Sequence, residues 1–190
     1  MEHERDEYLM ARVGRDQPEL LEKLLRRHAS PLLTFIERMI GDHHRGEELF
    51  QEVFLAVWVK RRQYQYPRPF KPWLYAIALN KCRAWLRGRS AHFVPLDAED
   101  VLTPTARDAS PAETVIATET AVLVNRAVQQ LPHHQRAVVV LRVWEGLSYA
   151  RIAEVVGCTE PTARSHMHHG LAALREHLQP RLDITGDRER

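Results

Sequence analysis

The chain has 190 residues, with 27 Lys+Arg against 25 Asp+Glu and a formal net charge of +2, a length that fits one ordinary domain or two small ones. Hydrophobic residues make up 44% and charged residues 27%, which are globular proportions and exclude wholesale disorder and collagen-like structure. Because there is no run of about 18 apolar residues and charges occur throughout the first 30 residues, we expect neither a membrane span nor a signal peptide, and a cytoplasmic protein.

The N-terminal part has the apolar spacing of amphipathic helices. Leucines between residues 20 and 25 predict a first helix that Pro18 opens, and apolar residues 32–40 predict a second helix that Pro31 opens. A third helix is expected after Gly41, with glutamates in its first turns, where the helix dipole favours carboxylates. Residues 1–52 carry twelve acidic and eight basic residues, a net charge of −4.

The next segment, residues 53–96, contains nine basic residues and no acidic one. A stretch without acids is what a polyanion-binding surface requires. A loop rich in proline and tyrosine spans residues 63–69, and a helix is predicted to begin near Phe70. Exposed aromatic rings in such a block can stack on unpaired bases, and we expect Tyr64 and Tyr66 to do so. Phe70 and Trp85 lie on the apolar face of the predicted helix and are expected in the core.

The apolar spacing typical of helices is lost after about residue 90 and returns from about residue 120. Residues 97–120 have a net charge of −5 and include two prolines, which is typical of a linker, and the remainder of the chain has a net charge of +2. Nothing alternates at period two over enough residues to predict a sheet. We therefore predict an all-α protein of two small helical domains joined by a flexible linker. The expected boundaries are an N-terminal domain over residues 1–92, a linker over 93–119, a C-terminal domain over 120–178 and a tail over 179–190.

The segment LSYARIAEVVGCTEPTARSHMHHG, residues 147–170, has the spacing of a helix-turn-helix. Gly157 suits the left-handed turn after the first helix, and Thr159 can cap a second helix that starts at Glu160 and Pro161. Ala153 lets the two helices pack closely. Short polar groups and an arginine near a helix N-terminus can reach base edges in a major groove, so this motif predicts a reader of duplex DNA.

Three segments resemble successive motifs of the extracytoplasmic-function (ECF) sigma factors, the compact bacterial sigma subunits of RNA polymerase. They are GEELFQEVFLAVW at 46–58, FKPWLYAIALNKCRAWLRGRS at 70–90 and the C-terminal stretch 131–178. The resemblance implies a non-enzymatic subunit that binds core RNA polymerase and directs promoter-specific initiation. It would contact the double-stranded −35 element and the single-stranded −10 element, and aid melting.

The resemblance also assigns residues to these roles. Core polymerase binding falls on Glu48, Leu49, Gln51 and Glu52. Binding of the −10 strand falls on Tyr64, Tyr66, Asn80, Lys81, Arg83 and Arg87. Reading of the −35 duplex falls on Thr162, Arg164, Ser165, His166, His168 and His169. The family usually has Arg or Lys at positions 166 and 169, so the three histidines predict weaker −35 binding above about pH 7 and stronger binding near pH 6.

Two other functions remain open at this point. One is a stand-alone helix-turn-helix regulator, which leaves the acid-free block without a role. The other is a metal-dependent enzyme using the eleven histidines, but the chain has no HExxH motif and no Gly-rich phosphate loop. We expect no catalytic residue, no cofactor and no metal, and two unpaired thiols at Cys82 and Cys158. An anti-sigma factor is a further partner that the resemblance suggests and the sequence does not identify.

Overall fold

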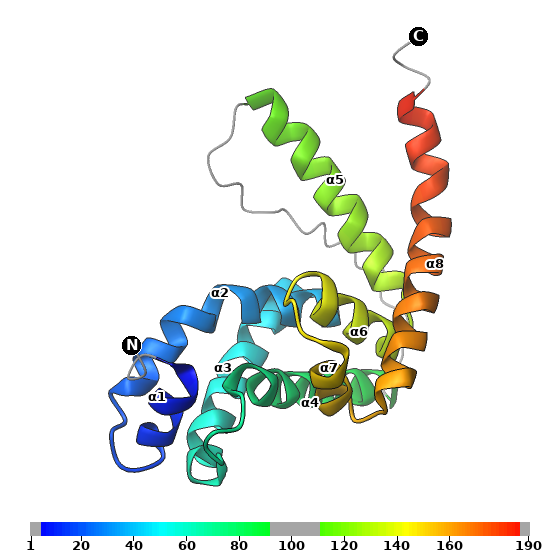
Figure 1. The fold of residues 1–190 in the computed structure, drawn as a ribbon. Coiled ribbons are helices and arrows are strands. Elements are labelled where there is room, and N and C mark those ends of the chain that lie inside the picture. The colour runs from blue at the N-terminus through cyan, green and yellow to red at the C-terminus, as the bar shows by residue number, and fades with distance from the viewer. Residues whose placement is uncertain (1–4, 92–110, 187–190) are drawn as a thin grey trace.

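The computed structural model describes residues 5–91 and 111–186, and every regular element in those ranges is helical (Figure 1), which confirms the all-α prediction. Residues 93–110 of the predicted linker lie outside the described part. The N-terminal half contains α1 (Asp6–Val13), α2 (Leu20–Ile40), α3 (His43–Lys60), a short 3₁₀ helix η2 (Arg61–Gln63) and α4 (Phe70–Ala91). The C-terminal half contains α5 (Pro111–Gln130), α6 (His133–Val143), α7 (Tyr149–Val156) and α8 (Glu160–Gly186).

Helix α2 differs from the prediction, because it is one helix of 21 residues with Pro31 inside it. Proline removes one backbone hydrogen bond and usually kinks or ends a helix. Here the apolar face stays buried on both sides of the proline, from Leu24 to Met39, so side-chain packing stabilises a helix that continues across it. Helix α1 was not predicted at all. It buries three apolar residues, Leu9, Met10 and Val13.

Short signals set the ends of the other N-terminal helices. Gly41 ends α2 with φ of +74°, and the Asp42 carboxylate caps α3 by accepting from the backbone N–H of Arg45 at 2.9 Å. Helix α4 begins at Phe70 as predicted, and Phe70 is fully buried. Trp85, expected in the core, is only partly buried against it.

The C-terminal half contains the predicted helix-turn-helix. Ser148 caps α7, Gly157 follows it with φ of +80°, and α8 starts at Glu160. Two boundaries differ from the prediction. Helix α5 begins at Pro111, so residues 111–119, assigned to the linker, are helical, and α8 runs past residue 178 to Gly186.

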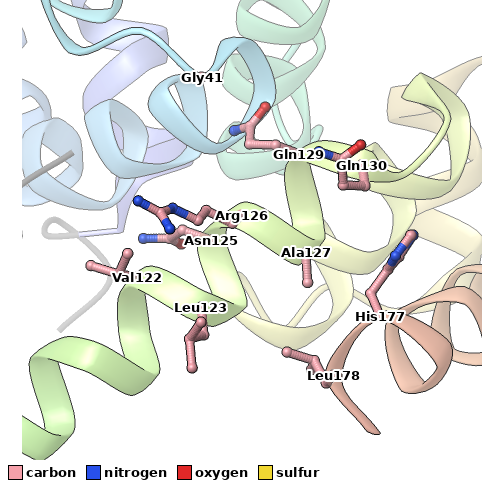
Figure 2. Close-up of a pocket in the computed structure, with 10 residues that line it drawn as sticks. All are labelled: Gly41, Val122, Leu123, Asn125, Arg126, Ala127, Gln129, Gln130, His177 and Leu178. Carbon is pink, nitrogen blue, oxygen red and sulfur yellow. The ribbon is translucent and has the colours of Figure 1, made fainter. Parts of the chain in front are cut away.

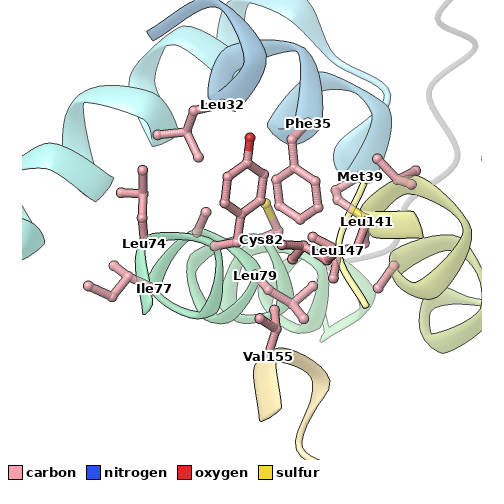
Figure 3. Packing of buried hydrophobic residues seen from close by; sticks show 14 of the residues in the cluster. Leu32, Phe35, Met39, Leu74, Ile77, Leu79, Cys82, Leu141, Leu147 and Val155 are labelled. Atoms are coloured by element: carbon pink, nitrogen blue, oxygen red, sulfur yellow. The ribbon is translucent and has the colours of Figure 1, made fainter. Parts of the chain in front are cut away.

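The two halves share one hydrophobic core (Figure 3). Met39, Leu79 and Cys82 of the N-terminal half belong to the same buried cluster as Leu141 and Val155 of the C-terminal half. Helix α7 packs along α4, and α6 packs against α2. The described structure is therefore a closed arrangement of the two domains.

Polar contacts join the halves around a cavity of about 310 Å³ between α5, α8 and the end of α2 (Figure 2). The Gln129 side chain, on the cavity wall, donates to the backbone carbonyl of Arg38 at 2.6 Å. Next to it, the buried Arg136 guanidinium donates to the carbonyl of Met39 at 2.6 Å. Side chains of the C-terminal half thus bond the carbonyls that end α2.

Candidate nucleic-acid interface

The exposed face of α3 contains only some of the predicted docking residues. Glu48 and Gln51 are exposed, as a contact surface requires. Leu49 is buried in line with Val53 and is not part of the exposed face of α3, so its assignment as a docking residue gains no support from the structure and stays a prediction. Two apolar residues that the sequence analysis missed complete the exposed face: Leu55 is 64% exposed and Val59 71% exposed.

Two residues assigned to different sites contact each other across α3 and α4. Glu52 accepts from the Lys81 ammonium at 3.0 Å and from the Arg45 guanidinium at 3.0 Å. The hydrogen bond from Lys81, then the Lys81 and Arg45 charges, hold the pKa of Glu52 below its usual value. The bond between Lys81 and Glu52 therefore joins the predicted strand-binding helix to the predicted polymerase helix.

The loop between η2 and α4 presents one of its two tyrosines. Tyr66 is 53% exposed. Tyr64 is buried, its ring lies edge-on to Trp73 with centroids 5.2 Å apart, and its hydroxyl donates to the Arg68 carbonyl, so the expectation that it is exposed for stacking is wrong. Burial raises the pKa of Tyr64. Tyr64 shapes the loop from inside while Tyr66 faces outward.

Helix α4 carries the remaining residues assigned to the −10 strand. Asn80 and Arg87 are exposed. Arg83 is half-buried and donates to the backbone carbonyl of Val156 at 3.0 Å, at the end of α7. The closed arrangement therefore uses part of this basic surface for contacts between the domains.

At the other end of α4, a buried carboxylate joins the domains. Glu145 follows α6, and its side chain accepts from the Tyr75 hydroxyl at 2.5 Å. The Lys71 ammonium lies 3.2 Å from the same carboxylate and donates to the Glu145 backbone carbonyl at 2.8 Å. Burial, followed by the bond to Glu145, raises the pKa of Tyr75. We call these three residues the Glu145 contact.

The outward face of α8 matches most of the predicted −35 residues. Thr162, Ser165, His168 and His169 are exposed, while Ala163 and Met167 are buried on the opposite face. Arg164 is exposed but engaged within the domain. Its guanidinium lies 2.6 Å from the Glu160 carboxylate and 4.4 Å from the Tyr149 ring centroid.

His166 does not share that outward face. It is half-buried and stacks on His134 of α6, with ring centroids 5.7 Å apart. Arg83 of α4 approaches the other side of the pair, its Nη2 atom 3.5 Å from Nδ1 of His134. Burial, then the charges of Arg83 and His166, lower the pKa of His134. The predicted three-histidine cluster is thus divided between the domain interface, where His166 lies, and the exposed side of α8, where His168 and His169 lie.

This arrangement predicts that acid weakens the closed form. A lowered folded-state pKa means that His134 contributes stability above its unfolded pKa of 6.5, and that this contribution is lost as the pH falls through 6.5 toward the folded value. Between about pH 7.5 and about pH 5.5, we expect the unfolding free energy of the wild type to fall more than that of His134→Asn. Urea unfolding at both pH values measures the difference, with His168→Asn as the control, because His168 lies on α8 outside the stack of His134, His166 and Arg83. Parallel pH profiles of all three proteins would contradict the prediction.

Among the side chains that the structure describes, those of residues 5–88 and 120–179, no three His, Cys, Asp or Glu are grouped so that they could hold a metal ion. No helix in these ranges is both long enough and apolar enough to span a membrane.

The exposed apolar pair on α3 could have been found from the sequence. Leu55 and Val59 are four residues apart, like Leu49, Val53 and Val57, but they lie on a different side of the helix. An apolar pair at helical spacing outside the buried stripe is the signal for a protein contact. By contrast, no pattern marked α1, because it has only eight residues and lies among charged side chains.

Comparison with known proteins places both halves in one family. Residues 24–92 match the family described as "Sigma-70 region 2", and residues 121–174 match "Sigma-70, region 4". The chain is 31% identical over 186 residues to the RNA polymerase sigma-H factor of Pseudomonas aeruginosa, covering 94% of this chain and 96% of the relative. It is 34% identical over 170 residues to the RNA polymerase sigma factor CarQ of Myxococcus xanthus, covering 89% and 95%.

Another relative carries the subfamily in its name. The ECF RNA polymerase sigma factor SigE of Mycolicibacterium smegmatis is 32% identical over 157 residues, covering 83% of this chain and 61% of the relative. The fold is shared with CnrH, solved in complex with the cytosolic domain of CnrY, at a TM-score of 0.70 and 23% identity over 92% of this chain and 97% of that one. The stand-alone regulator is thereby set aside, since the N-terminal half matches too. The chain belongs to the ECF sigma factors, the subunits that direct RNA polymerase to promoters.

Proposed function

We propose that this sigma factor binds core polymerase through α3, holds the melted −10 strand along the loop at 64–69 and α4, and reads the −35 duplex with α8. One observation carries the proposal: the acid-free block folds into a continuous stretch of η2, loop and α4. Its exposed members include Arg62, Arg68 and Arg87 as well as the ring of Tyr66. A cationic surface with an exposed aromatic ring is what a single-stranded nucleic acid binds.

The polymerase contact is assigned to the exposed face of α3. Glu48, Gln51, Leu55 and Val59 form a strip along one side of the helix, with polar groups nearer its N-terminus and apolar groups nearer its C-terminus. Protein interfaces combine an apolar centre with a polar rim. Leu55 and Val59 supply that centre in place of the buried Leu49.

The −35 contact is assigned to the start of α8. Thr162 and Ser165 offer hydroxyl groups, and His168 and His169 offer ring nitrogens, on the face opposite the buried Ala163. Arg164 must leave Glu160 and Tyr149 before it can bond a base or a phosphate. A recognition helix in the major groove uses side chains of this kind near its N-terminus.

The closed arrangement cannot contact both promoter elements at once. Elements at −10 and −35 lie about 25 base pairs apart, which is about 85 Å of duplex. Helices α4 and α7, one from each DNA-binding domain, are in direct contact here. We infer that the domains separate when the chain binds promoter DNA, and that separation frees Arg83 and Lys71 for the strand.

An anti-sigma factor is the further partner we propose. The RpoE sigma factor of Bartonella quintana, solved in complex with the anti-sigma factor NepR, shares the fold at a TM-score of 0.70 and 22% identity, over 84% of this chain and 96% of that one. A protein that stabilises the closed domains would prevent simultaneous contact with the two promoter elements.

The docking face can be tested with Leu55→Glu. A charge placed on the apolar centre of an interface is expected to weaken binding to core polymerase roughly tenfold or more. The measurement is the affinity of the labelled full-length chain for core enzyme, followed by run-off transcription from the DNA upstream of its own operon. Leu171→Glu is the matched control, because Leu171 is also an exposed leucine but lies on α8. If the two variants bind core polymerase with equal affinity, the exposed face of α3 is not the polymerase contact.

A further inference from the structure

Two stacked histidines lie beside Arg83 where the domains meet. We propose that protonation of this pair, His134 and His166, opens the closed arrangement and so frees Arg83 for the −10 strand. The inference rests on the proposed function of α4 and adds a condition, the pH, that controls when this surface is available. We call Arg83, His134 and His166 the histidine contact.

The histidine contact joins three helices from the two domains. His134 of α6 and His166 of α8 have ring centroids 5.7 Å apart and ring planes 15° from parallel. Arg83 of α4 approaches from the N-terminal domain, with its Nη2 atom 3.5 Å from Nδ1 of His134, and the same atom donates to the carbonyl of Val156 at 3.0 Å. Helices α4 and α7 pack together in this arrangement, so separation of the domains takes Arg83 away from both histidines.

Protonation reverses the sign of this contact. A neutral imidazole has one ring nitrogen that accepts hydrogen bonds, and Nδ1 of His134 faces a guanidinium donor. A protonated imidazole has an N–H on both nitrogens and carries a positive charge, so it accepts nothing from Arg83 and repels it. An attraction that helps to hold the closed form at neutral pH thus becomes a repulsion in acid.

No acidic side chain balances the added charge. The charges that act on His134 are those of Arg83 and His166. The other titratable or charged groups nearby, from α4, α6 and the turn after α7, are Arg87, His133, Arg136 and Cys158. In the described part of the chain, none of the side chains whose charges act on Arg83, His133 or His134 is a carboxylate. A proton is therefore added to a group of side chains that is already basic.

Linkage then favours the open form at low pH. Burial, followed by the charges of Arg83 and His166, holds the pKa of His134 below its usual value in the closed arrangement. Once the domains separate, the influence of Arg83 is lost and the ring binds a proton more readily. Protons therefore bind preferentially to the open form, and the fraction of open molecules rises as the pH falls through 6.5, the ordinary pKa of histidine.

The exposure of His134 sets the size of the effect. Because the ring is exposed, protons reach it from solvent without prior opening of the domains. Water also screens its repulsion from Arg83, which keeps the effect well below that of a buried pair. We expect a change in DNA affinity of roughly three- to tenfold for such a contact.

This pH response differs from one that arises on the proposed −35 surface. His168 and His169 are exposed on α8 and are not part of the histidine contact. Their protonation adds charge for duplex DNA but leaves Arg83 bonded to the C-terminal domain. Single-stranded DNA, which is the ligand proposed for α4, therefore reports on the histidine contact.

The test compares His134→Asn with His168→Asn in the full-length chain. Both changes remove one exposed histidine, but only His134 belongs to the histidine contact. The probe is a tetramethylrhodamine-labelled single-stranded DNA of mixed sequence, titrated at about pH 7.5 and at about pH 5.5. We expect the affinity of the wild type, relative to that of His134→Asn, to rise roughly three- to tenfold between the two pH values, and His168→Asn to follow the wild type. The radius of gyration from small-angle scattering should increase in acid for the wild type and less for His134→Asn.

The outcomes separate this inference from the proposed function. Equal pH responses of the wild type and His134→Asn would show that the histidine contact does not control opening. Tighter binding in acid with an unchanged radius of gyration would mean that the added charge attracts the strand directly, and would overturn the role of opening. If Arg87→Ala binds the probe as tightly as the wild type at both pH values, the proposed function of α4 fails, while the radius of gyration still tests the histidine contact.

Discussion

Replacing Arg136 with methionine is expected to lower the unfolding free energy of the full-length chain by roughly 3 kcal/mol. The guanidinium is buried and donates to the carbonyl of Met39 at 2.6 Å and to that of Leu131 at 3.1 Å, as well as to the carbonyl of Gln129. Each of these three carbonyls lies in the last turn of α2 or around the end of α5. The last carbonyls of a helix have no hydrogen-bond donor from the helix itself. Methionine fills similar space but donates nothing. Equilibrium urea unfolding measures the loss.

The size of this effect follows from where the charge lies. Burial lowers the pKa of Arg136, which records the cost of taking the guanidinium out of water. Its hydrogen bonds to carbonyls offset that cost. Without them, each buried carbonyl that is left without a donor lowers the unfolding free energy by about 1–3 kcal/mol. Part of the cost of burying the charge is recovered when the charge is removed, so the sum over the acceptors is an upper bound.

Arg126→Met is the matched control, because Arg126 lies on α5 near the same junction but is exposed. Substitutions at exposed positions of this kind usually change stability by less than about 0.5 kcal/mol. A loss in Arg136→Met no greater than that of the control would show that the carbonyls find other donors, and that Arg136 does not hold α2 to the C-terminal half.

Apolar periodicity predicted the helices whose buried residues form one continuous face. It placed α3, α4 and the helix-turn-helix, and Gly41 and Gly157 marked two turns with positive φ. It predicted two helices in place of α2, because proline usually ends a helix, whereas here the packing on both sides of Pro31 outweighs that local preference. It missed α1, whose three buried residues lie within a highly charged segment.

The types of residue in the candidate site could be predicted from the sequence. Which of them are exposed, and which contact the other domain, could not. Leu49 and Leu55 are six residues apart on one helix, and only their packing shows that the first is buried and the second exposed. Tyr64 and Tyr66 have similar neighbours in the sequence, yet the first ring is enclosed by Phe70 and Trp73. The bond from Arg83 to Val156 joins residues 73 positions apart, and no local pattern could show it.

The Glu145 contact gives the second large expected effect. The carboxylate is buried where α4 meets the C-terminal half, and the Tyr75 hydroxyl and Lys71 are both bonded to it. Removing the carboxylate leaves the buried Tyr75 hydroxyl without its acceptor, whereas the Lys71 ammonium, which is partly exposed, can turn to water. We expect Glu145→Ala to destabilise the closed arrangement by about 2 kcal/mol.

This loss should appear as tighter binding of single-stranded DNA. If the strand binds only when the domains are apart, its apparent affinity is proportional to the fraction of open molecules. A shift of about 2 kcal/mol raises that fraction roughly 30-fold while the closed form still predominates. The measurement is the affinity of the full-length variant for a fluorescein-labelled single-stranded DNA of mixed sequence, together with the radius of gyration from small-angle scattering, which increases as the domains separate.

Glu154→Ala separates domain opening from a simple change of charge. Glu154 is an exposed glutamate on α7 that pairs with Arg151 of the same helix, so its removal changes the net charge equally without touching the interface. Tighter DNA binding by Glu145→Ala alone, with a larger radius of gyration, means that the closed form competes with the DNA. Equal gains in the two variants would mean that charge alone attracts the strand, and the closed arrangement would then leave the −10 surface accessible.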